Sequence, residues 1–269
     1  MFDNNLRGMI DDVKDGRLDR RAFVKRMIAV GLTAPMANQI LSLGGVAMAQ
    51  SPNPYKPTKR GGGGPLKLLW WQGPTLLNPH FATGTKDQDG SRIFYEPLAS
   101  WDVDGHLNPI LAAEIPSIQN GGLSADAKSV TWKLKPGVKW HDGKPLSADD
   151  VVFTWEYASD PATAAVSIET YSGLTVEKID DLTIRINFKK PTPFWANAFV
   201  GGYGSIIPKH LFADYKGGKS REAPNNLKPV GTGPYKFVER VQQDRIVLEK
   251  FADYWNKDNV FIDRIVYLP

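Results

Sequence analysis

The sequence predicts a mixed α/β (α+β) fold, on three observations. Short apolar or alternating runs typical of strands recur along the chain, and the clearest is 129–134, where every second residue is apolar. Residues 147–157 carry the signature of a capped helix. The 269 residues are 42% hydrophobic and include 8 Trp, which is enough apolar surface for one large domain or two small ones.

The first elements are expected between residues 66 and 115. The apolar run LKLLWW, 66–71, lies between Gly/Pro-rich segments and predicts a largely buried first strand. Residues 91–98 are expected to be helical, and 98–103 to form a strand entering a tight turn at 102–105. Residues 107–115 are compatible with either a short helix or a loop.

The centre of the chain is expected to alternate strands and turns before one helix. In 129–134, Val130, Trp132 and Leu134 fall on one face, which predicts a half-buried strand followed by turns at 136–137 and 142–143.

Ser147 stands three residues before Asp150 and just ahead of an apolar run, which is the pattern of a capped helix start. Asp149 and Asp150 would then lie at the positive end of the helix dipole.

The remainder predicts a hairpin, a short helix, a polar loop and three more strands. In chain order these are strands 175–179 and 182–188, a strand end leading into a short helix at 205–211, a loop at 216–229, and strands 235–240, 245–250 and 262–268.

His141, Asp142, Asp149 and Asp150 lie within ten residues of one another and raise the question of a catalytic or metal site. The four histidines, at 80, 106, 141 and 210, include no pair at i,i+4 spacing, and the chain has no cysteine. Turn and cap chemistry accounts for each residue of the cluster. We therefore expect no catalytic residue, no metal ligand and no cofactor.

The N-terminus predicts an export signal over residues 1–49. A basic stretch, a mildly apolar segment at 27–48 and the triplet Ala47-Met48-Ala49 follow in order, with cleavage expected before Gln50.

The basic stretch matches a twin-arginine motif through Arg20, Arg21, Phe23 and Lys25. The match is imperfect, because Asp19 and Val24 replace the more usual residues. A retained membrane anchor is the alternative, and the polar residues and glycines within 27–48 argue against it. Residues 50–65, rich in Pro and Gly, are expected to be a flexible linker.

Charge argues against a nucleic-acid partner. The formal net charge is +4, seven of the 33 basic and five of the 29 acidic residues precede Gln50, and no basic block follows.

Four stretches together resemble a known family. The segment 132–160, WKLKPGVKWHDGKPLSADDVVFTWEYASD, resembles the signature region of the extracellular solute-binding proteins of family 5, the peptide- and nickel-binding class that serves ABC importers. The stretches 77–105, 205–212 and 230–255 agree with the same family in order and spacing, so that the resemblance covers residues 66–269.

The resemblance implies a periplasmic-binding-protein-like (type II) lobe one, incomplete and without the second lobe. Its first part would span 66–113, an inserted subdomain 114–229, and the return strands 230–269. Because such proteins close two lobes on the ligand, one lobe by itself should bind weakly or not at all.

The implied function is that of a substrate-binding subunit, not an enzyme, which captures peptides or similar small solutes in the periplasm and delivers them to an ABC permease. A monomer is expected at full length. The loop after the first strand would face the ligand, since ligands of open α/β sheets lie beyond strand ends. The candidate ligand-binding residues are Gln72, Gly73, Pro74, Thr75, Leu77 and Asn78, unless this loop only shapes the surface.

Two other functional classes remain open. An exported hydrolase would draw an acid/base pair from Asp102, Asp104, Asp142 or Glu156, but the sequence has no nucleophile elbow, zinc motif or recognisable carboxylate pair. An envelope interaction or chaperone-like protein would need a large apolar surface patch.

Overall fold

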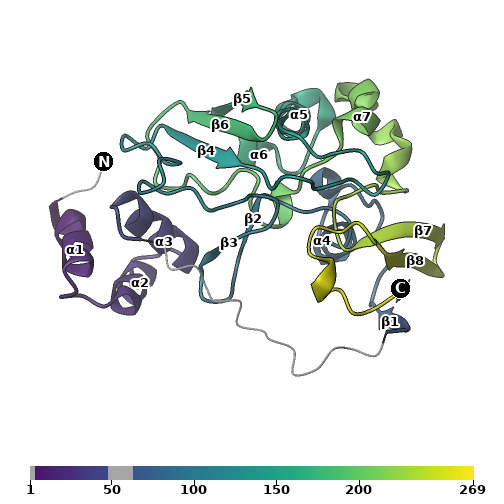
Figure 1. Ribbon diagram of the computed structural model, residues 1–269, viewed down its shortest axis with the longest axis horizontal. Helices are drawn as coiled ribbons and strands as arrows, with labels where there is room; N and C mark the ends of the chain where they lie inside the picture. The colour runs from purple at the N-terminus through teal and green to yellow at the C-terminus, as the bar shows by residue number, and fades with distance from the viewer. Residues whose placement is uncertain (1–3, 48–62) are drawn as a thin grey trace.

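The computed structural model describes residues 4–47 and 63–269, and within them the mixed α/β fold is confirmed. Figure 1 shows three parts: a group of N-terminal helices at one end, a central part built on a small sheet, and a second sheet at the opposite end that holds the C-terminus. The expected cleavage residues Ala49 and Gln50 and most of the 50–65 linker lie outside the described residues.

The N-terminal part consists of α1 (Asn4–Lys14), α2 (Arg20–Ala29) and α3 (Ala34–Leu43). The three helices share a small apolar core formed by Ile10, Phe23, Met27, Ala37, Ile40 and Leu41. In the part of the chain that the structure describes, no helix is both long and apolar enough to cross a membrane.

The small sheet confirms the strands expected in the centre of the chain. Strands β4 (Ser129–Lys133), β5 (Leu174–Asp180) and β6 (Thr183–Phe188) pair antiparallel in the order β4-β6-β5. Val130 and Trp132 are fully buried, as the alternation predicts, and α5 (Ala148–Ser159) packs against β5 and β6.

The second sheet has the order β1-β9-β8-β7. It contains β1 (Pro65–Leu69), β7 (Tyr235–Val241), β8 (Arg245–Lys250) and β9 (Arg264–Leu268). β1 pairs parallel with β9, and the other neighbours are antiparallel. The three C-terminal strands are those expected from the sequence.

The prediction of a largely buried first strand is wrong. β1 lies at the edge of its sheet, where Leu69 is 81% exposed and the following Trp71 is 72% exposed. The apolar run correctly identified a strand, but burial depends on what covers the sheet, and no described element covers this edge.

The prediction of a helix at 91–98 is also wrong beyond its first two residues. The helix is α4 (Thr85–Arg92), and the chain leaves it because the next residues bond to distant segments. The carbonyl of Phe94 accepts from Gly233 N at 2.8 Å, and the carbonyl of Glu96 accepts from Ile206 N at 3.0 Å. These tertiary bonds override local helix propensity.

Residues 107–115 form neither a helix nor only a loop. Strand β2 (Ala99–Trp101), shorter than the expected 98–103, pairs antiparallel with β3 (Leu107–Pro109) across the predicted turn. In the 205–211 segment the short helix is confirmed as α7 (Lys209–Phe212), but the residues before it form no strand.

The remaining elements are short. They are α6 (Ile168–Tyr171) and the 3-10 helices η1 (Pro79–Phe81), η2 (Pro161–Thr163), η3 (Gly202–Gly204), η4 (Ala213–Tyr215), η5 (Gly217–Glu222), η6 (Pro224–Asn226) and η7 (Lys257–Asn259). The expected loop 216–229 thus contains two 3-10 helices, η5 and η6.

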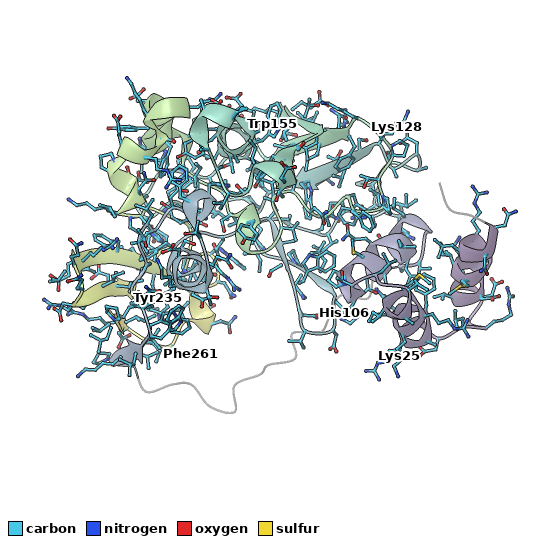
Figure 2. The ribbon with its side chains drawn as sticks, turned by 180° about the vertical axis from the view of Figure 1, so that it is seen from behind. Lys25, His106, Lys128, Trp155, Tyr235 and Phe261 are labelled. Carbon is cyan, nitrogen blue, oxygen red and sulfur yellow. The ribbon has the colours of Figure 1, made fainter. Side chains whose placement is uncertain are left out.

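One apolar core joins the two sheets. It runs from Leu77 and Phe94 through Trp132, Trp140 and α5 to Ile265 and Tyr267 at the C-terminal sheet. Figure 2 shows side chains filling the space between these parts. The domain boundaries at 113/114 and 229/230 remain predictions within this continuous core.

Candidate functional site

The loop after β1 borders a surface cavity of about 410 Å³. The loop contributes four of the six candidate residues, and the ends of β7, β8 and β9 supply the opposite wall. The lining consists of Gln72, Gly73, Pro74, Thr75, Arg240, Val241, Gln242, Gln243, Arg245, Ile246, Tyr267 and Pro269.

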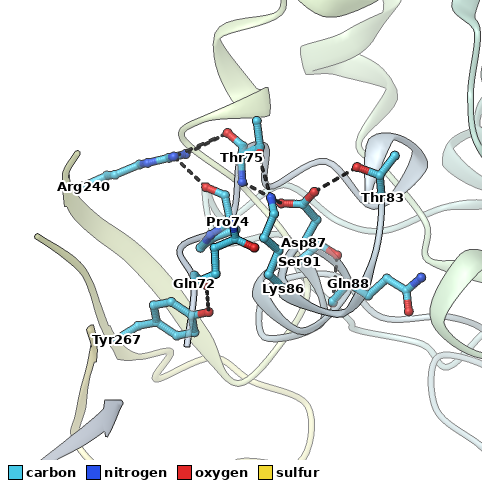
Figure 3. Close-up of polar contacts among 10 residues, drawn as sticks. All are labelled: Gln72, Pro74, Thr75, Thr83, Lys86, Asp87, Gln88, Ser91, Arg240 and Tyr267. Carbon is cyan, nitrogen blue, oxygen red and sulfur yellow. Dashed lines mark hydrogen bonds and ion pairs between the residues drawn. The ribbon is translucent and has the colours of Figure 1, made fainter. Parts of the chain in front are cut away.

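Arg240, in β7, holds this loop from one side (Figure 3). Its Nη2 atom donates to the carbonyl of Pro74 at 2.7 Å, and both terminal nitrogens lie 3.4 Å from the carbonyl of Thr75. Burial lowers the pKa of Arg240, against the favourable charge of Asp87. A guanidinium remains charged despite such a shift, so Arg240 serves as a permanent clamp on two main-chain carbonyls.

Asp87, in the first turn of α4, holds the loop from the other side (Figure 3). It is only 1% exposed and accepts hydrogen bonds from Thr75 N at 2.6 Å, Lys86 Nζ at 2.9 Å and Thr83 Oγ1 at 3.3 Å. The bond from Lys86 is charge-assisted and adds to the bonds from Thr75 and Thr83. Asp87 and Arg240 together fix Pro74 and Thr75.

Gly73 directly precedes the two fixed residues, and its own main-chain groups make no such bond. Its N–H and C=O have no hydrogen-bond partner among residues 4–47 and 63–269. Next to it, the hydroxyl of Tyr267 donates to the carbonyl of Gln72 at 3.3 Å. The cavity therefore presents a held stretch of backbone with polar groups available to an incoming ligand or to water.

Leu77 and Asn78 do not reach the cavity. Both are fully buried, and Asn78 donates to Asn226 Oδ1 at 2.9 Å while its own Oδ1 accepts from His80 N at 2.9 Å. Asn78 also caps η1 (Pro79–Phe81). Of the six candidates, Gln72, Gly73, Pro74 and Thr75 are brought together at the cavity, whereas Leu77 and Asn78 belong to the interior.

Sequence reasoning missed Arg240, Asp87 and Tyr267. A second cavity of about 530 Å³ adjoins the first and shares Thr75, Arg240 and Gln242 with it, so Arg240 stands between the two. No local pattern marks this residue, because its partner Pro74 lies 166 positions away in the sequence.

His141 has the structural role that turn chemistry predicts. Its Nδ1 accepts from Gly231 N at 3.1 Å, and its Nε2 lies 2.9 Å from the carbonyl of Gly233, which requires the neutral ring with the proton on Nε2. Burial lowers the pKa of His141 to about 4, which keeps the ring neutral at physiological pH.

Three of the four carboxylates considered for a hydrolase, those of Asp102, Asp142 and Glu156, are engaged by other partners and lie in separate parts of the fold. Asp142 contacts His210 Nε2 at 2.7 Å, Glu156 pairs with Lys216 at 3.1 Å, and Asp102 accepts from Asp104 N and His106 N within the β2–β3 turn. Across residues 4–47 and 63–269 no group of three or more His, Asp or Glu side chains is placed to hold a metal ion.

Comparison with known proteins agrees with this fold. The family model described as bacterial extracellular solute-binding proteins, family 5 Middle, matches residues 106–269. The chain is 31% identical over 211 residues to the periplasmic oligopeptide-binding protein OppA of Escherichia coli, and 32% identical over 196 residues to the glutathione-binding protein GsiB of Pectobacterium atrosepticum. Each match covers 72% of this chain and 36–37% of the relative.

A solved structure gives the same result. The oligopeptide-binding protein AppA of Bacillus subtilis, in complex with a nonapeptide, superposes with a TM-score of 0.68 at 32% identity, over 78% of this chain and 40% of AppA. The chain thus spans about two fifths of its relatives' length, which is consistent with the expected incomplete lobe. With a family match over more than half of its residues, this chain belongs to the bacterial extracellular solute-binding proteins of family 5.

Proposed function

We propose that this protein is the substrate-binding component of an ABC importer, which captures a peptide or a similar small solute and delivers it to a permease. The observation that carries the proposal is the braced loop 72–75, where Tyr267 holds Gln72 before Gly73, and Arg240 and Asp87 fix Pro74 and Thr75 after it. An extended peptide is recognised chiefly by main-chain hydrogen bonds, which this loop can supply at Gly73 without a side-chain signature. Membership of the family supports the same role.

The cavity also suits a ligand of variable sequence. It combines polar side chains at Gln72, Gln242 and Gln243 with the ring of Tyr267, and its open side leaves room for water around a ligand side chain. Water-mediated contacts tolerate different side chains at little cost in affinity. Closure by a second lobe would complete the site, as in other hinged binding proteins.

The place of action in this proposal is the periplasm. Residues 1–49 would act as a twin-arginine export leader through Arg20, Arg21, Phe23 and Lys25, with cleavage after Ala49. The protein would bind and release solute without chemistry of its own; in support, Asp102, Asp142 and Glu156 of the hydrolase alternative each serve another contact.

The test of the site replaces Arg240 by Met in a form of the protein that includes both lobes. We expect the affinity for a pool of short peptides, measured by isothermal titration calorimetry, to fall about tenfold, which corresponds to the loss of roughly 1.4 kcal/mol of preorganisation. Arg185→Met is the matched control, because Arg185 is an exposed arginine of the small sheet. Equal peptide affinity of Arg240→Met and Arg185→Met would show that the loop 72–75 is not part of the binding site.

A second measurement tests the single-lobe expectation. The chain of residues 1–269 should bind the same pool far more weakly than the two-lobed form, because one wall of the site cannot exclude water. Comparable affinities would contradict a cleft shared between lobes. Failure of the two-lobed form to bind any peptide would contradict the proposed ligand class.

A further inference from the structure

The N-terminal helices are bound to the rest of the chain by specific polar contacts. Asn38, only 1% exposed, donates from Nδ2 to the carbonyl of Gly105 at 2.7 Å, and Gln39, also 1% exposed, accepts from Ala196 N at 3.0 Å. Gln119 donates to the carbonyl of Gly45 at 2.9 Å. Buried amides with matched partners on two separate loops indicate a defined docking position rather than a loose apolar contact.

The backbone of the body, residues 63–269, approaches α3 so closely that a side chain at Gly105 would be tightly crowded. Gly105, in the β2–β3 turn, has φ +76°, and a Cβ atom built there would lie 3.0 Å from Ala34 Cβ and 3.2 Å from Asn38 Nδ2. Figure 2 shows the neighbouring His106 beside these helices. The β2–β3 turn of the body thus packs closely against the start of α3.

The same contact reaches the twin-arginine motif. Asn38 Oδ1 accepts from Arg20 Nε at 3.2 Å and Nη2 at 3.0 Å, while Arg20 Nη1 lies 3.4 Å from the carbonyl of Ala47. Burial lowers the pKa of Arg20. Asn38 therefore links the first arginine of the motif directly to the body of the protein.

The other motif residues divide between the two sides of α2. Phe23 is fully buried in the helical core, whereas Arg21 and Lys25 are exposed. A partner that reads both arginines and the phenylalanine together cannot do so while α2 keeps this packing, because two of the four side chains are turned inward.

The docked helices do not fit the body tightly everywhere. A cavity of about 1120 Å³ lies between α1, α3 and the loops at 125–127 and 190–193. Attachment through a few polar points beside such a gap is the arrangement expected of a contact that can open.

We propose that the body of this protein binds its own N-terminal helices through Asn38 and Gln39, and that this docking stabilises the helical packing that withholds Arg20 and Phe23 from an export receptor. The docking stands on the contacts alone. The consequence for export rests on the proposed function of residues 1–49 as a leader.

Hydrogen exchange of the unprocessed chain tests the docking. In the double variant Asn38→Ala/Gln39→Ala we expect amide exchange in body segments 102–107 and 194–198 to accelerate about tenfold, from the loss of buried hydrogen bonds. The matched control is Asn4→Ala/Asn5→Ala, which changes two exposed amides of α1 in the same helical group. Unchanged protection of α5 shows that the body remains folded, and unchanged exchange at 102–107 and 194–198 would overturn the docking.

Export of the same variants tests the consequence. The double variant should yield processed protein faster than wild type, and the control at the wild-type rate; a rate equal to wild type for both would overturn the withholding of the motif. Arg20→Lys/Arg21→Lys separates the two proposals. If it leaves export unaffected, the twin-arginine route fails, while the exchange result still decides the docking.

Discussion

Asp149 and Asp150 are adjacent in sequence and have opposite environments. Asp149 is half-exposed, and its contact with Lys178 at 2.7 Å lowers its pKa. Asp150 is 5% exposed, accepts from Ser147 N at 3.0 Å, Lys209 N at 2.9 Å and Trp140 Nε1 at 3.4 Å, and has a pKa raised by burial. The Asp149 carboxylate therefore makes a surface ion pair, whereas the Asp150 carboxylate joins the start of α5 to two further segments.

Removal of Asp150 is expected to cost far more stability than removal of Asp149. Asp150→Ala leaves three donors without their acceptor, one of them a helix cap, and should lower the free energy of unfolding by about 3 kcal/mol. Asp149→Ala removes an exposed ion pair and should cost less than about 1 kcal/mol. Urea unfolding of both variants measures the difference, and equal losses would mean that the cap is not structural.

At the scale of elements, the loop 230–234 connects the two sheets. His141 bonds both main-chain groups of Gly231, Thr232 Oγ1 donates to buried Glu96 at 2.9 Å, and Gly233 N donates to Phe94. Glu96 also accepts from Tyr254 at 2.7 Å and Trp255 at 3.2 Å, while burial raises its pKa. Residues 94–96, where the expected helix at 91–98 is broken, therefore hold this loop in place.

The close approach at Gly231 leads to a prediction. A Cβ atom there would lie 1.8 Å from the carbonyl oxygen of Phe94, so Gly231→Ala must displace backbone and should destabilise the chain by about 3 kcal/mol or more. Gly218→Ala is the control, since Gly218 is exposed with open space around it, and should change stability by less than about 1 kcal/mol. Thermal unfolding distinguishes them; a tolerated Gly231→Ala would contradict the packing of this loop.

At the scale of the whole molecule, two buried histidines connect stability to pH. Burial lowers the pKa of both His80 and His141 from 6.5 to about 4. Between these values the unfolded chain binds protons that the folded chain does not, so stability is complete above pH 6.5 and falls as the pH decreases toward 4.

Each histidine should contribute a slope of about 1.4 kcal/mol per pH unit within that window. His141→Asn should therefore reduce the pH dependence of the unfolding free energy by about that amount per unit, measured by denaturant titrations from pH 7 to pH 4.5. The raised pKa values of Glu96 and Asp150 act in the opposite direction, and comparison with wild type cancels them. An unchanged slope would show that His141 is protonated in the folded state.

Several elements could be predicted from local sequence because local physics determines them. The strand at 129–134, the hairpin of β5 and β6, the cap of α5 and the three C-terminal strands each follow from alternation, turn residues or caps. The four motif blocks also indicated the family. The position of Gln72, Gly73, Pro74 and Thr75 after the first strand was enough to nominate them.

Tertiary structure alone decided the rest, because the responsible partners are far apart in the chain. The exposure of β1 depends on its place at a sheet edge, the end of α4 on bonds from Gly233 and Ile206, and the brace on Pro74 on Arg240. The hydrogen bond between Asn38 and Gly105 likewise joins residues far apart, 67 positions along the chain. The sequence by itself determined the strands of the centre and the C-terminus, the start of α5 and the family to which the chain belongs; the fold decided which residues face the cavity, since that depends on contacts that no local pattern encodes.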